Sequence, residues 1–517
     1  MLKPLFYLLI ITCSLFSTKG FSQGTFQKVF SGPSIEHGRS VQFCPDGGYS
    51  LSGNSSSFPV GGYAGYLIKT DSLGTVLWGK TVTGTTFAIL EETKVLPDSG
   101  FISVGEIADT NMSNHLFIVR WNANGGMLWT KTFSTTDDLF GYDIALSPTG
   151  GFFVAALCNA VTKQMYIVHL NEFGDTLWTR HSSDTINFTP YDIVATDDGG
   201  VVIASESGPL SGVYKMNLVK LDSTGNLVWS KNYGSQIYNS VTYALESTAD
   251  NGFILCGSMG GNGMPILIRT DANGDTVWTR MYKATYGNLY LHGISTCDDN
   301  GIVACGQMVA GFDVQAIILK TDSMGDTLWT TAFTGLQSQL YRYTGETPGG
   351  EYFFTGSSYV STGNHDILFT KTNNQGRTGC DDTVSIEYAL PLGLQVIPAA
   401  PAFLPGGLTA TQIGISVDSG YISSDLCAMI GIREERISED FLVYPNPSQG
   451  IFRLTFSNKN SSGRLIVCNP LGEFILMKDL QNVESAVIDL AGQPPGIYLL
   501  RFESGSQYQT ARICLVD

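Results

Sequence analysis

The 517-residue chain has few charged side chains, and few of those it has are basic. Charged residues make up 15% of the chain, and 29 Lys and Arg stand against 46 Asp and Glu, a formal net charge of −17. A nucleic-acid-binding protein needs a basic surface, which this composition lacks, so we expect no nucleic-acid partner. A hydrophobic content of 43% is too high for a disordered chain.

Motifs for metal, cofactor and nucleophilic chemistry are also missing. The six His residues show no metal-ligand spacing, and no Cys-x-x-Cys pair, nucleophile elbow or phosphate-binding loop occurs. The turn at 271–275 resembles a calcium loop but lacks the Gly at position 6 and the closing Glu of that loop. We therefore expect no metal, no cofactor and no catalytic activity. Carboxylates dispersed over the loops leave an extracellular polysaccharide-degrading enzyme as the alternative.

The longest apolar run lies at the start of the chain. Lys3 is followed by mostly apolar residues from Leu5 to Phe16, and small residues follow as far as Ser22. A positive charge before a short apolar run predicts a secretory signal peptide over residues 1–22, because a membrane-spanning helix needs about 20 apolar residues. A lipoprotein signal that uses Cys13 is the alternative. We expect no transmembrane segment after the signal is removed.

Six of the seven Trp residues recur in one frame of about fifty residues, which indicates a repeat architecture. Each follows a Gly by four residues, and a turn of the Asp-x-x-Gly type separates it from the strand before it. Two further strands flank an acidic, Gly-rich turn such as that at 45–48. Four short strands per repeat predict a propeller blade. The recurring residues are Trp78, Trp129, Trp178, Trp229, Trp278 and Trp329.

The count of each strand type predicts how the ring closes. The Trp strand occurs six times and the others seven times, and Cys380 stands where a seventh Trp is expected. The stretch Phe26–Phe30 has the pattern of the missing strand. We predict an all-β, seven-bladed β-propeller over residues 24–379, with this N-terminal strand completing the last blade. The Trp strands are expected to be outermost and their Trp residues structural, whereas Trp121 lies outside the frame and is expected to be exposed.

The Gly-x-x-x-Trp frame resembles the tryptophan-docking repeat of quinoprotein-like propellers. In this chain the Asp lies one residue closer to the Gly than in that family. The resemblance implies the propeller fold alone, because a quinone enzyme of the family would need a pair of adjacent cysteines and the chain has none.

A Pro-containing segment of different composition follows the predicted propeller, between Cys380 and Cys427. Export favours a disulfide between these two residues, which would staple the segment. Residues 428–440 are interpreted as a solvated linker, so 380–440 form a Cys-bracketed segment and linker. Four other cysteines occupy shared repeat positions and are expected to be buried strand residues: Cys44, Cys297, Cys256 and Cys305.

The C-terminal stretch 441–517 has the period-2 pattern of a small β-sandwich. It begins Tyr444-Pro445-Asn446-Pro447-Ser-Gln-Gly450 and later contains a Pro-x-Gly-Ile-Tyr strand. These motifs resemble the type IX secretion C-terminal sorting domain of the Bacteroidetes. The resemblance implies the type IX secretion machinery as a partner, passage through the periplasm, and release or attachment at the outer cell surface.

One repeat position of the predicted innermost strands offers a candidate site at the channel mouth. It lies nine residues before the Gly that ends the acidic turn in six repeats, and before the aligned Glu351 in the seventh, and ring closure makes its first and last members neighbours. An aromatic arc opposite a basic pair could stack a sugar ring and hold a carboxylate or phosphate. We therefore expect a non-catalytic propeller that binds an extracellular glycan or protein there; a purely structural surface or adhesion component is the alternative. In ring order the position holds Arg39, Glu91, Tyr142, Tyr191, Tyr243, His292 and Arg342.

Overall fold

The structure is a computed structural model, and it divides the chain into two compact units, Met1–Cys427 and Ala428–Asp517. The described residues contain strands and turns but no helix, so the prediction of an all-β fold is confirmed. The structure describes residues 24–32, 34–57, 62–83, 86–183, 185–235, 237–260, 264–284, 287–311, 313–333, 338–359, 365–378, 386–389, 395–398, 403–405, 409–411, 416–418, 422–425, 441–444, 448–456, 461–468, 474–494, 496–504 and 507–515.

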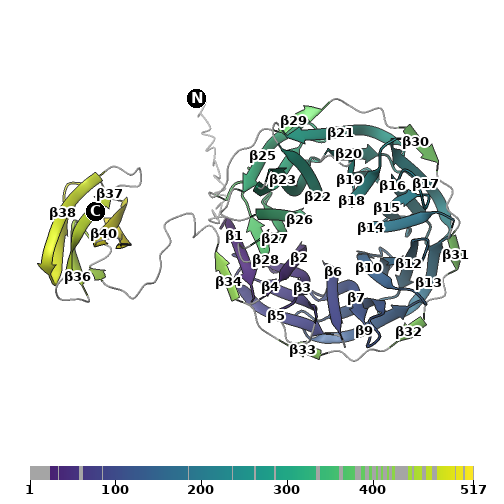
Figure 1. The fold of residues 1–517 in the computed structure, drawn as a ribbon, viewed down its shortest axis with the longest axis horizontal. Coiled ribbons are helices and arrows are strands. Elements are labelled where there is room, and N and C mark those ends of the chain that lie inside the picture. The colour runs from purple at the N-terminus through teal and green to yellow at the C-terminus, as the bar shows by residue number, and fades with distance from the viewer. Residues whose placement is uncertain are drawn as a thin grey trace, which may run out of the picture. The chain divides into compact units, whose positions relative to one another are not determined.

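Four-stranded antiparallel sheets recur through the first unit and surround a central opening (Figure 1). In six sheets the strands follow one another in chain order from the centre outwards. The seventh combines three late strands with the N-terminal strand. The sheets are β2 (Glu36–Phe43), β3 (Tyr49–Ser55), β4 (Ala64–Thr70), β5 (Val76–Thr83); β6 (Phe87–Val95), β7 (Phe101–Ala108), β8 (Asn114–Trp121), β9 (Met127–Ser134); β10 (Leu139–Leu146), β11 (Phe152–Cys158), β12 (Gln164–Leu170), β13 (Thr176–Ser182); β14 (Asn187–Ala195), β15 (Val201–Gly208), β16 (Lys215–Leu221), β17 (Leu227–Gly234); β18 (Ser240–Ser247), β19 (Phe253–Met259), β20 (Pro265–Thr270), β21 (Thr276–Ala284); β22 (Asn288–Thr296), β23 (Ile302–Ala310), β24 (Asp313–Thr321), β25 (Thr327–Phe333); and β26 (Ser338–Glu346), β27 (Tyr352–Tyr359), β28 (His365–Lys371), β1 (Phe26–Ser31).

The turn before each Trp strand is built by the residue types that the repeat supplies. In the first sheet, Oδ1 of Asp71 accepts the backbone N–H groups of Leu73 (2.9 Å) and Thr75 (2.8 Å). Gly74 closes this turn with φ +72°, a conformation that glycine adopts without a steric penalty. The same geometry recurs at Asp271, whose Oδ1 accepts the N–H groups of Asn273 and Asp275. The repeated turn therefore fixes the hairpin between the third and fourth strands.

The Trp rings pack between neighbouring sheets. A Cβ placed on Gly125, in the turn of the second sheet, would lie 2.8 Å from the ring of Trp78 in the first sheet. The equivalent Gly of each following sheet lies against the Trp of the sheet before it, as far as Gly376 against Trp329. Phe26 of β1 takes the place of a Trp and lies against Gly74. Only a glycine leaves room for each aromatic ring, so one frame of the repeat sets the contact between sheets.

A further set of short strands lies outside the Trp strands, which the sequence did not predict. Residues 386–425, which we call the belt, add a fifth strand to six of the described sheets in reverse chain order (Figure 1). The Trp strands are therefore not outermost there, which corrects the prediction. The pairs are β29 (Ile386–Ala389) with β21, β30 (Gln395–Pro398) with β17, β31 (Phe403–Pro405) with β13, β32 (Thr409–Thr411) with β9, β33 (Ser416–Asp418) with β5 and β34 (Ile422–Asp425) with β1.

Trp121 differs from its prediction because it is fully buried. It ends β8, the third strand of its sheet, where both faces are covered by neighbouring sheets. Its Nε1–H donates to Oγ of Ser103 at 3.1 Å. The four cysteines at shared repeat positions are free and, as predicted, buried. Cys256 and Cys305 lie in strands, as predicted, whereas Cys44 and Cys297 directly follow the ends of β2 and β22. Their burial raises the pKa of the Cys44 thiol to about 11 and that of Cys297 to about 12.

The second unit consists of two antiparallel sheets around one apolar core that includes Phe452, Val467 and Leu500. Gly450 has φ +140°, and a Cβ there would lie 3.2 Å from Cα of Ala491. The strand order is β35–β36–β39 in one sheet and β38–β37–β40–β41 in the other. The strands are β35 (Phe441–Tyr444), β36 (Ile451–Phe456), β37 (Ser461–Cys468), β38 (Phe474–Val483), β39 (Ser485–Asp489), β40 (Gly496–Ser504) and β41 (Gln507–Leu515).

Candidate functional site

A cavity of about 550 Å³ lies among the innermost strands of the first unit. Its lining includes every member of the repeat position that the sequence singled out. Deeper residues of the same strands complete the wall, among them Glu92, Lys94, Asp143, Glu246 and Tyr343. The seven predicted positions, Arg39, Glu91, Tyr142, Tyr191, Tyr243, His292 and Arg342, are thus brought together around one opening, which we call the mouth.

Each of the seven mouth residues is the extra residue of a β-bulge. The pairing between the first and second strands skips one residue in every sheet, between Gly38 and Ser40 in the first sheet and at the equivalent place in the others. A bulge leaves its extra residue out of the ladder and re-aims its side chain. The repeated bulge is therefore the local structure that presents these side chains to the cavity.

The two mouth arginines do not act as an equivalent basic pair. Nη1 of Arg39 lies 3.3 Å from Oε2 of Glu91, and its Nε donates to Oδ1 of Asn54 at 3.3 Å. Arg342 remains accessible to water, and within the described part of the chain its guanidinium has no ion pair or hydrogen bond. Partial desolvation and the charge of Arg39 lower the pKa of Arg342. Arg342 is therefore the mouth cation that an anion would satisfy best.

Two uncharged imidazoles lie beside Arg342. Burial, reinforced by the positive charge of Arg342, lowers the pKa of His292 to about 4. Burial also lowers the pKa of His37 to about 4, with Arg39, His365 and Arg342 as further causes. Both rings are neutral at pH 7 and can donate one hydrogen bond each. His292 also packs edge-to-face on Tyr243, with ring centroids 5.0 Å apart.

The opposite side of the mouth is aromatic. The rings of Tyr142 and Tyr191 meet edge-to-face with centroids 5.9 Å apart. The hydroxyl of Tyr191 hydrogen-bonds the carboxyl of Glu206, and that of Tyr243 bonds Ser258. Burial raises the pKa of Tyr142 to about 12, so its hydroxyl stays protonated. The arc offers both ring surface and hydroxyl groups to a ligand.

Two glutamates beside this arc were missed by the sequence reasoning. Burial, followed by the charge of Glu91, raises the pKa of Glu106 to about 8, and burial raises that of Glu206. Glu106 and Glu206 occupy one repeat position of the second strands, β7 and β15. In other sheets the same position supplies Asn54 and Ser258, which bond Arg39 and Tyr243. A search of second-strand positions for polar residues would have found them.

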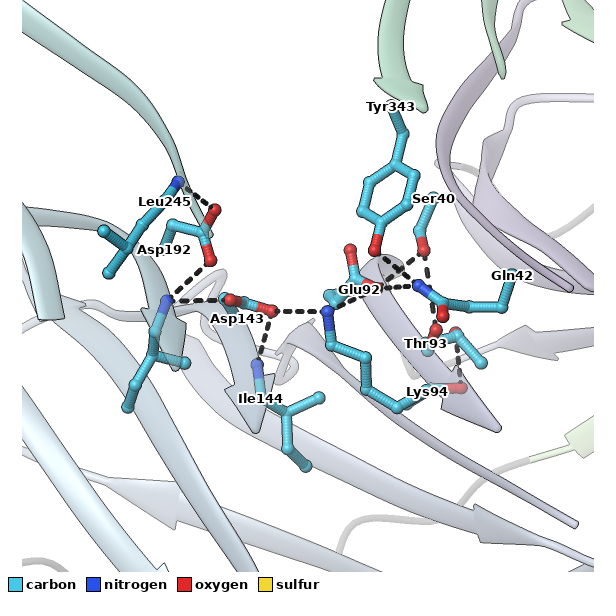
Figure 2. A network of polar contacts seen from close by, with 12 residues as sticks. Ser40, Gln42, Glu92, Thr93, Lys94, Asp143, Ile144, Asp192, Leu245 and Tyr343 are labelled. Atoms are coloured by element: carbon cyan, nitrogen blue, oxygen red, sulfur yellow. Dashed lines mark hydrogen bonds and ion pairs between the residues drawn. The ribbon is translucent and has the colours of Figure 1, made fainter. Parts of the chain in front are cut away.

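Below the mouth, acidic side chains surround one lysine (Figure 2). Nζ of Lys94 lies 3.2 Å from Oε1 of Glu92 and 3.7 Å from Oδ1 of Asp143. Ser40 donates its hydroxyl to Glu92 at 2.8 Å, and Gln42 donates its amide to the hydroxyl of Tyr343 at 2.5 Å. Burial opposes the charge of Lys94, but Asp143 and Glu92 hold its pKa above its usual value. The lysine is thus fully engaged.

Three acids of this layer have raised pKa values. Asp192 accepts the backbone N–H of Leu245 at 2.7 Å, and burial followed by the charge of Asp143 raises its pKa. Burial also raises the pKa of Glu92 and of Glu246 to about 7. No group of three or more His, Cys, Asp or Glu among the described residues is placed to hold a metal ion. Among the described residues at the floor of the mouth, four acidic side chains thus stand against the single cation Lys94, which Glu92 and Asp143 already engage.

Other predicted residues lie partly outside the described structure. Residues 1–22, Cys380 and Cys427 are outside it, as are Pro445, Asn446 and Pro447 of the sorting motif. The side chain of Tyr444 is half-exposed, and the carbonyl of Gly450 accepts the N–H of Leu490 at 2.7 Å. The described residues contain no helix long and apolar enough to cross a membrane.

Comparison with known proteins assigns the C-terminal unit. Residues 442–516 match the secretion system C-terminal sorting domain, the family that directs proteins to the type IX secretion system. The sorting domain indicates export to the cell surface or secretion, and it implies interaction with the secretion machinery. No curated protein matches the chain.

Three solved structures show a distant likeness to the chain. A structure of Sqt1 from Chaetomium thermophilum is 10% identical, with a TM-score of 0.38, over 72% of this chain and 100% of Sqt1. A second Sqt1 structure from that organism is 7% identical, with a TM-score of 0.34, over 68% and 98%. The tail fiber of Staphylococcus aureus phage P68 is 8% identical, with a TM-score of 0.23, over 70% and 95%. The repeated four-stranded antiparallel sheets are consistent with a propeller.

Proposed function

We propose that the chain is an exported, non-catalytic, seven-bladed β-propeller that binds an extracellular glycan or protein at its channel mouth. Closure of the ring by β1 is supported by its pairing with β28, in which Phe26 lies opposite Lys371. The contact of Phe26 with Gly74 gives the first sheet the same aromatic neighbour that the Trp residues give the others. Export rests on the sorting domain.

The single observation that carries ligand binding is the set of seven bulges. Bulges re-aim side chains and are over-represented next to active sites, and here all seven sheets carry one at the same position. The mouth holds three tyrosines, a histidine and an arginine without an ion pair in the described chain, around a cavity of about 550 Å³. This volume falls in the range of about 300–1,000 Å³ typical of small-ligand sites.

A polysaccharide-degrading enzyme is the second candidate, and one observation favours it. Burial and the charge of Glu91 raise the pKa of Glu106 to about 8, so a protonated carboxyl lies beside the mouth at neutral pH, and burial also raises the pKa of Glu206. Perturbed carboxyls of this kind are typical of general acids. Release of reducing ends from a bound polysaccharide, lost in Glu106→Gln, would establish this candidate over a binding protein.

A glycan-array screen of the whole exported chain tests the proposed function. We expect binding to a subset of extracellular glycans, and loss of that binding in Tyr142→Ala/Tyr191→Ala. Tyr444→Ala is the matched control, because it removes a half-exposed tyrosine from the sorting domain instead. Binding that the double variant and the control both retain would place the ligand elsewhere, and the absence of any glycan or protein ligand would contradict the proposal.

A further inference from the structure

We propose that the mouth selects a sugar bearing a single carboxylate, such as a uronic acid residue, with Arg342 holding the carboxylate and the Tyr142–Tyr191 side holding the ring. This inference rests on the proposed function and names the ligand class of the same site. It differs from recognition by an arginine pair, because Arg39 is already bound by Glu91 at 3.3 Å.

The distribution of charge round the mouth supports one anionic group on the ligand. Three cations line the cavity, and two are engaged: Arg39 by Glu91, and Lys94 by Glu92 and Asp143. Arg342 has no such partner in the described chain, and the guanidinium fork matches the two oxygens of a carboxylate. One free guanidinium can satisfy one carboxylate, whereas a polyanion would meet no second cation.

The surroundings of Arg342 favour an anion at that point and not deeper in the channel. His292 and His37 are neutral beside it, so neither pairs with Arg342 in place of the anion as a carboxylate would, and a neutral imidazole can donate one hydrogen bond. Below lies Lys94, whose charge Glu92 and Asp143 already engage, so an anion that moves inward meets no free cation among the described residues. The carboxylate is therefore confined to the mouth.

The rest of the mouth suits a polyhydroxylated ring. Tyr142 and Tyr191 present ring surface in an edge-to-face pair, against which the C–H face of a sugar can pack. The hydroxyl of Tyr142 and the carboxyl of Glu106 have no hydrogen-bond partner among the described residues. A protonated carboxyl both donates and accepts, which matches a sugar hydroxyl.

Isothermal titration of the full chain with three oligosaccharides tests the inference. The probes are an oligosaccharide that carries one uronic acid residue, the methyl ester of that oligosaccharide, which removes the charge but keeps the ring, and an oligosaccharide that carries one sulfate ester instead of the carboxylate. We expect the oligosaccharide with one carboxylate to bind at least about tenfold more tightly than the other two, because a charge-assisted bidentate pair is lost in the ester. Arg342→Ala should remove that preference and Arg342→Lys should restore only part of it. Arg280→Ala is the control, because Arg280 lies on the outer strand β21 and pairs with Asp326 instead of lining the mouth.

The outcomes separate this inference from the proposed function. Equal binding of acid and ester, or binding of the acid that Arg342→Ala leaves unchanged, overturns the carboxylate assignment while the mouth remains a ligand site. Tighter binding of the sulfated probe also overturns it. If no carbohydrate binds the unmodified chain, both the inference and a glycan-binding mouth fail. Thermal melting of each variant confirms that it is folded.

Discussion

Arg39 and Glu91 extend from the neighbouring innermost strands β2 and β6 and form an ion pair at the channel mouth, with Nη1 and Oε2 3.3 Å apart. Both are bulge residues of their sheets, so the pair joins two sheets through their re-aimed side chains. It also makes the mouth asymmetric, because it neutralises one of the two arginines and leaves Arg342 available.

A double-mutant cycle measures how much this pair contributes to stability. Each side chain is about a quarter exposed, 27% for Arg39 and 25% for Glu91. We expect Arg39→Ala and Glu91→Ala to couple by about 0.5–1 kcal/mol in the free energy of unfolding, as for partly exposed pairs. The measurement is chemical denaturation at low and high salt. A coupling of zero at low salt would show that the two side chains do not interact in solution.

The contact between Phe26 and Gly74 predicts a large cost for a small substitution. A Cβ at Gly74 would lie 2.7 Å from Cζ of Phe26, and the residue has φ +72°. Gly47 is the matched control, because it has φ +83° and no atom within 4 Å of a Cβ. Gly74→Ala should lower the free energy of unfolding by about 1–3 kcal/mol more than Gly47→Ala, because both strain the backbone but one also displaces the ring. Equal costs would mean that β1 does not close on the first sheet.

The raised pKa of Glu246 predicts that Glu246→Gln changes the free energy of unfolding in a pH-dependent way. Burial raises its folded pKa to about 7 from a usual value of 4.5, although the charge of Lys94 opposes the shift, whereas that of Asp143 adds to it. A raised carboxyl pKa favours the folded state at low pH, and that advantage is lost as the pH rises from about 4.5 to 7. Glu246→Gln should therefore have little effect near pH 4.5 and stabilise the protein by about 1–3 kcal/mol above pH 7. Denaturation curves across this range check the prediction, and a difference that does not change with pH would contradict it.

Removal of the belt should expose the edges of the strands with which it pairs. Six described outer strands pair with belt strands, for example Thr81–Thr83 with Ser416–Asp418. Open edges are templates for pairing between molecules. Deletion of residues 386–425 should lead to self-association in light scattering, whereas deletion of the separate unit at 441–517 should leave a monodisperse protein. The prediction would be contradicted if the chain without residues 386–425 stayed monodisperse and kept the melting temperature of the full chain.

Sequence could predict the parts of this fold that repeat. The spacing of the Trp residues predicted where the strands lie. The unequal strand counts predicted that the N-terminal strand pairs with the last blade, and it pairs with β28. One repeat position predicted the seven mouth residues that line the cavity. The residue that follows each bulge was equally visible in the sequence, but the mouth was read at a single position, so Glu92 and Asp143 were overlooked.

What sequence could not predict depends on contacts between segments that share no pattern. The belt strands are three or four residues long and form only because an outer edge is there to pair with. The pairing of Arg39 with Glu91 follows from the closeness of two bulges. Trp121 was expected to be exposed because it lacks the repeat frame, yet its strand is covered on both faces.

Hydrogen–deuterium exchange with a bound ligand tests the central claim, that the channel mouth is the binding site, most directly. The measurement compares the full chain with and without the glycan selected on the array. The account predicts slower exchange in the innermost strands that carry the bulges, among them β10 (Leu139–Leu146), β14 (Asn187–Ala195), β18 (Ser240–Ser247), β22 (Asn288–Thr296) and β26 (Ser338–Glu346), and no change in the Trp strands. Protection confined to the outer strands or to the sorting domain would contradict it.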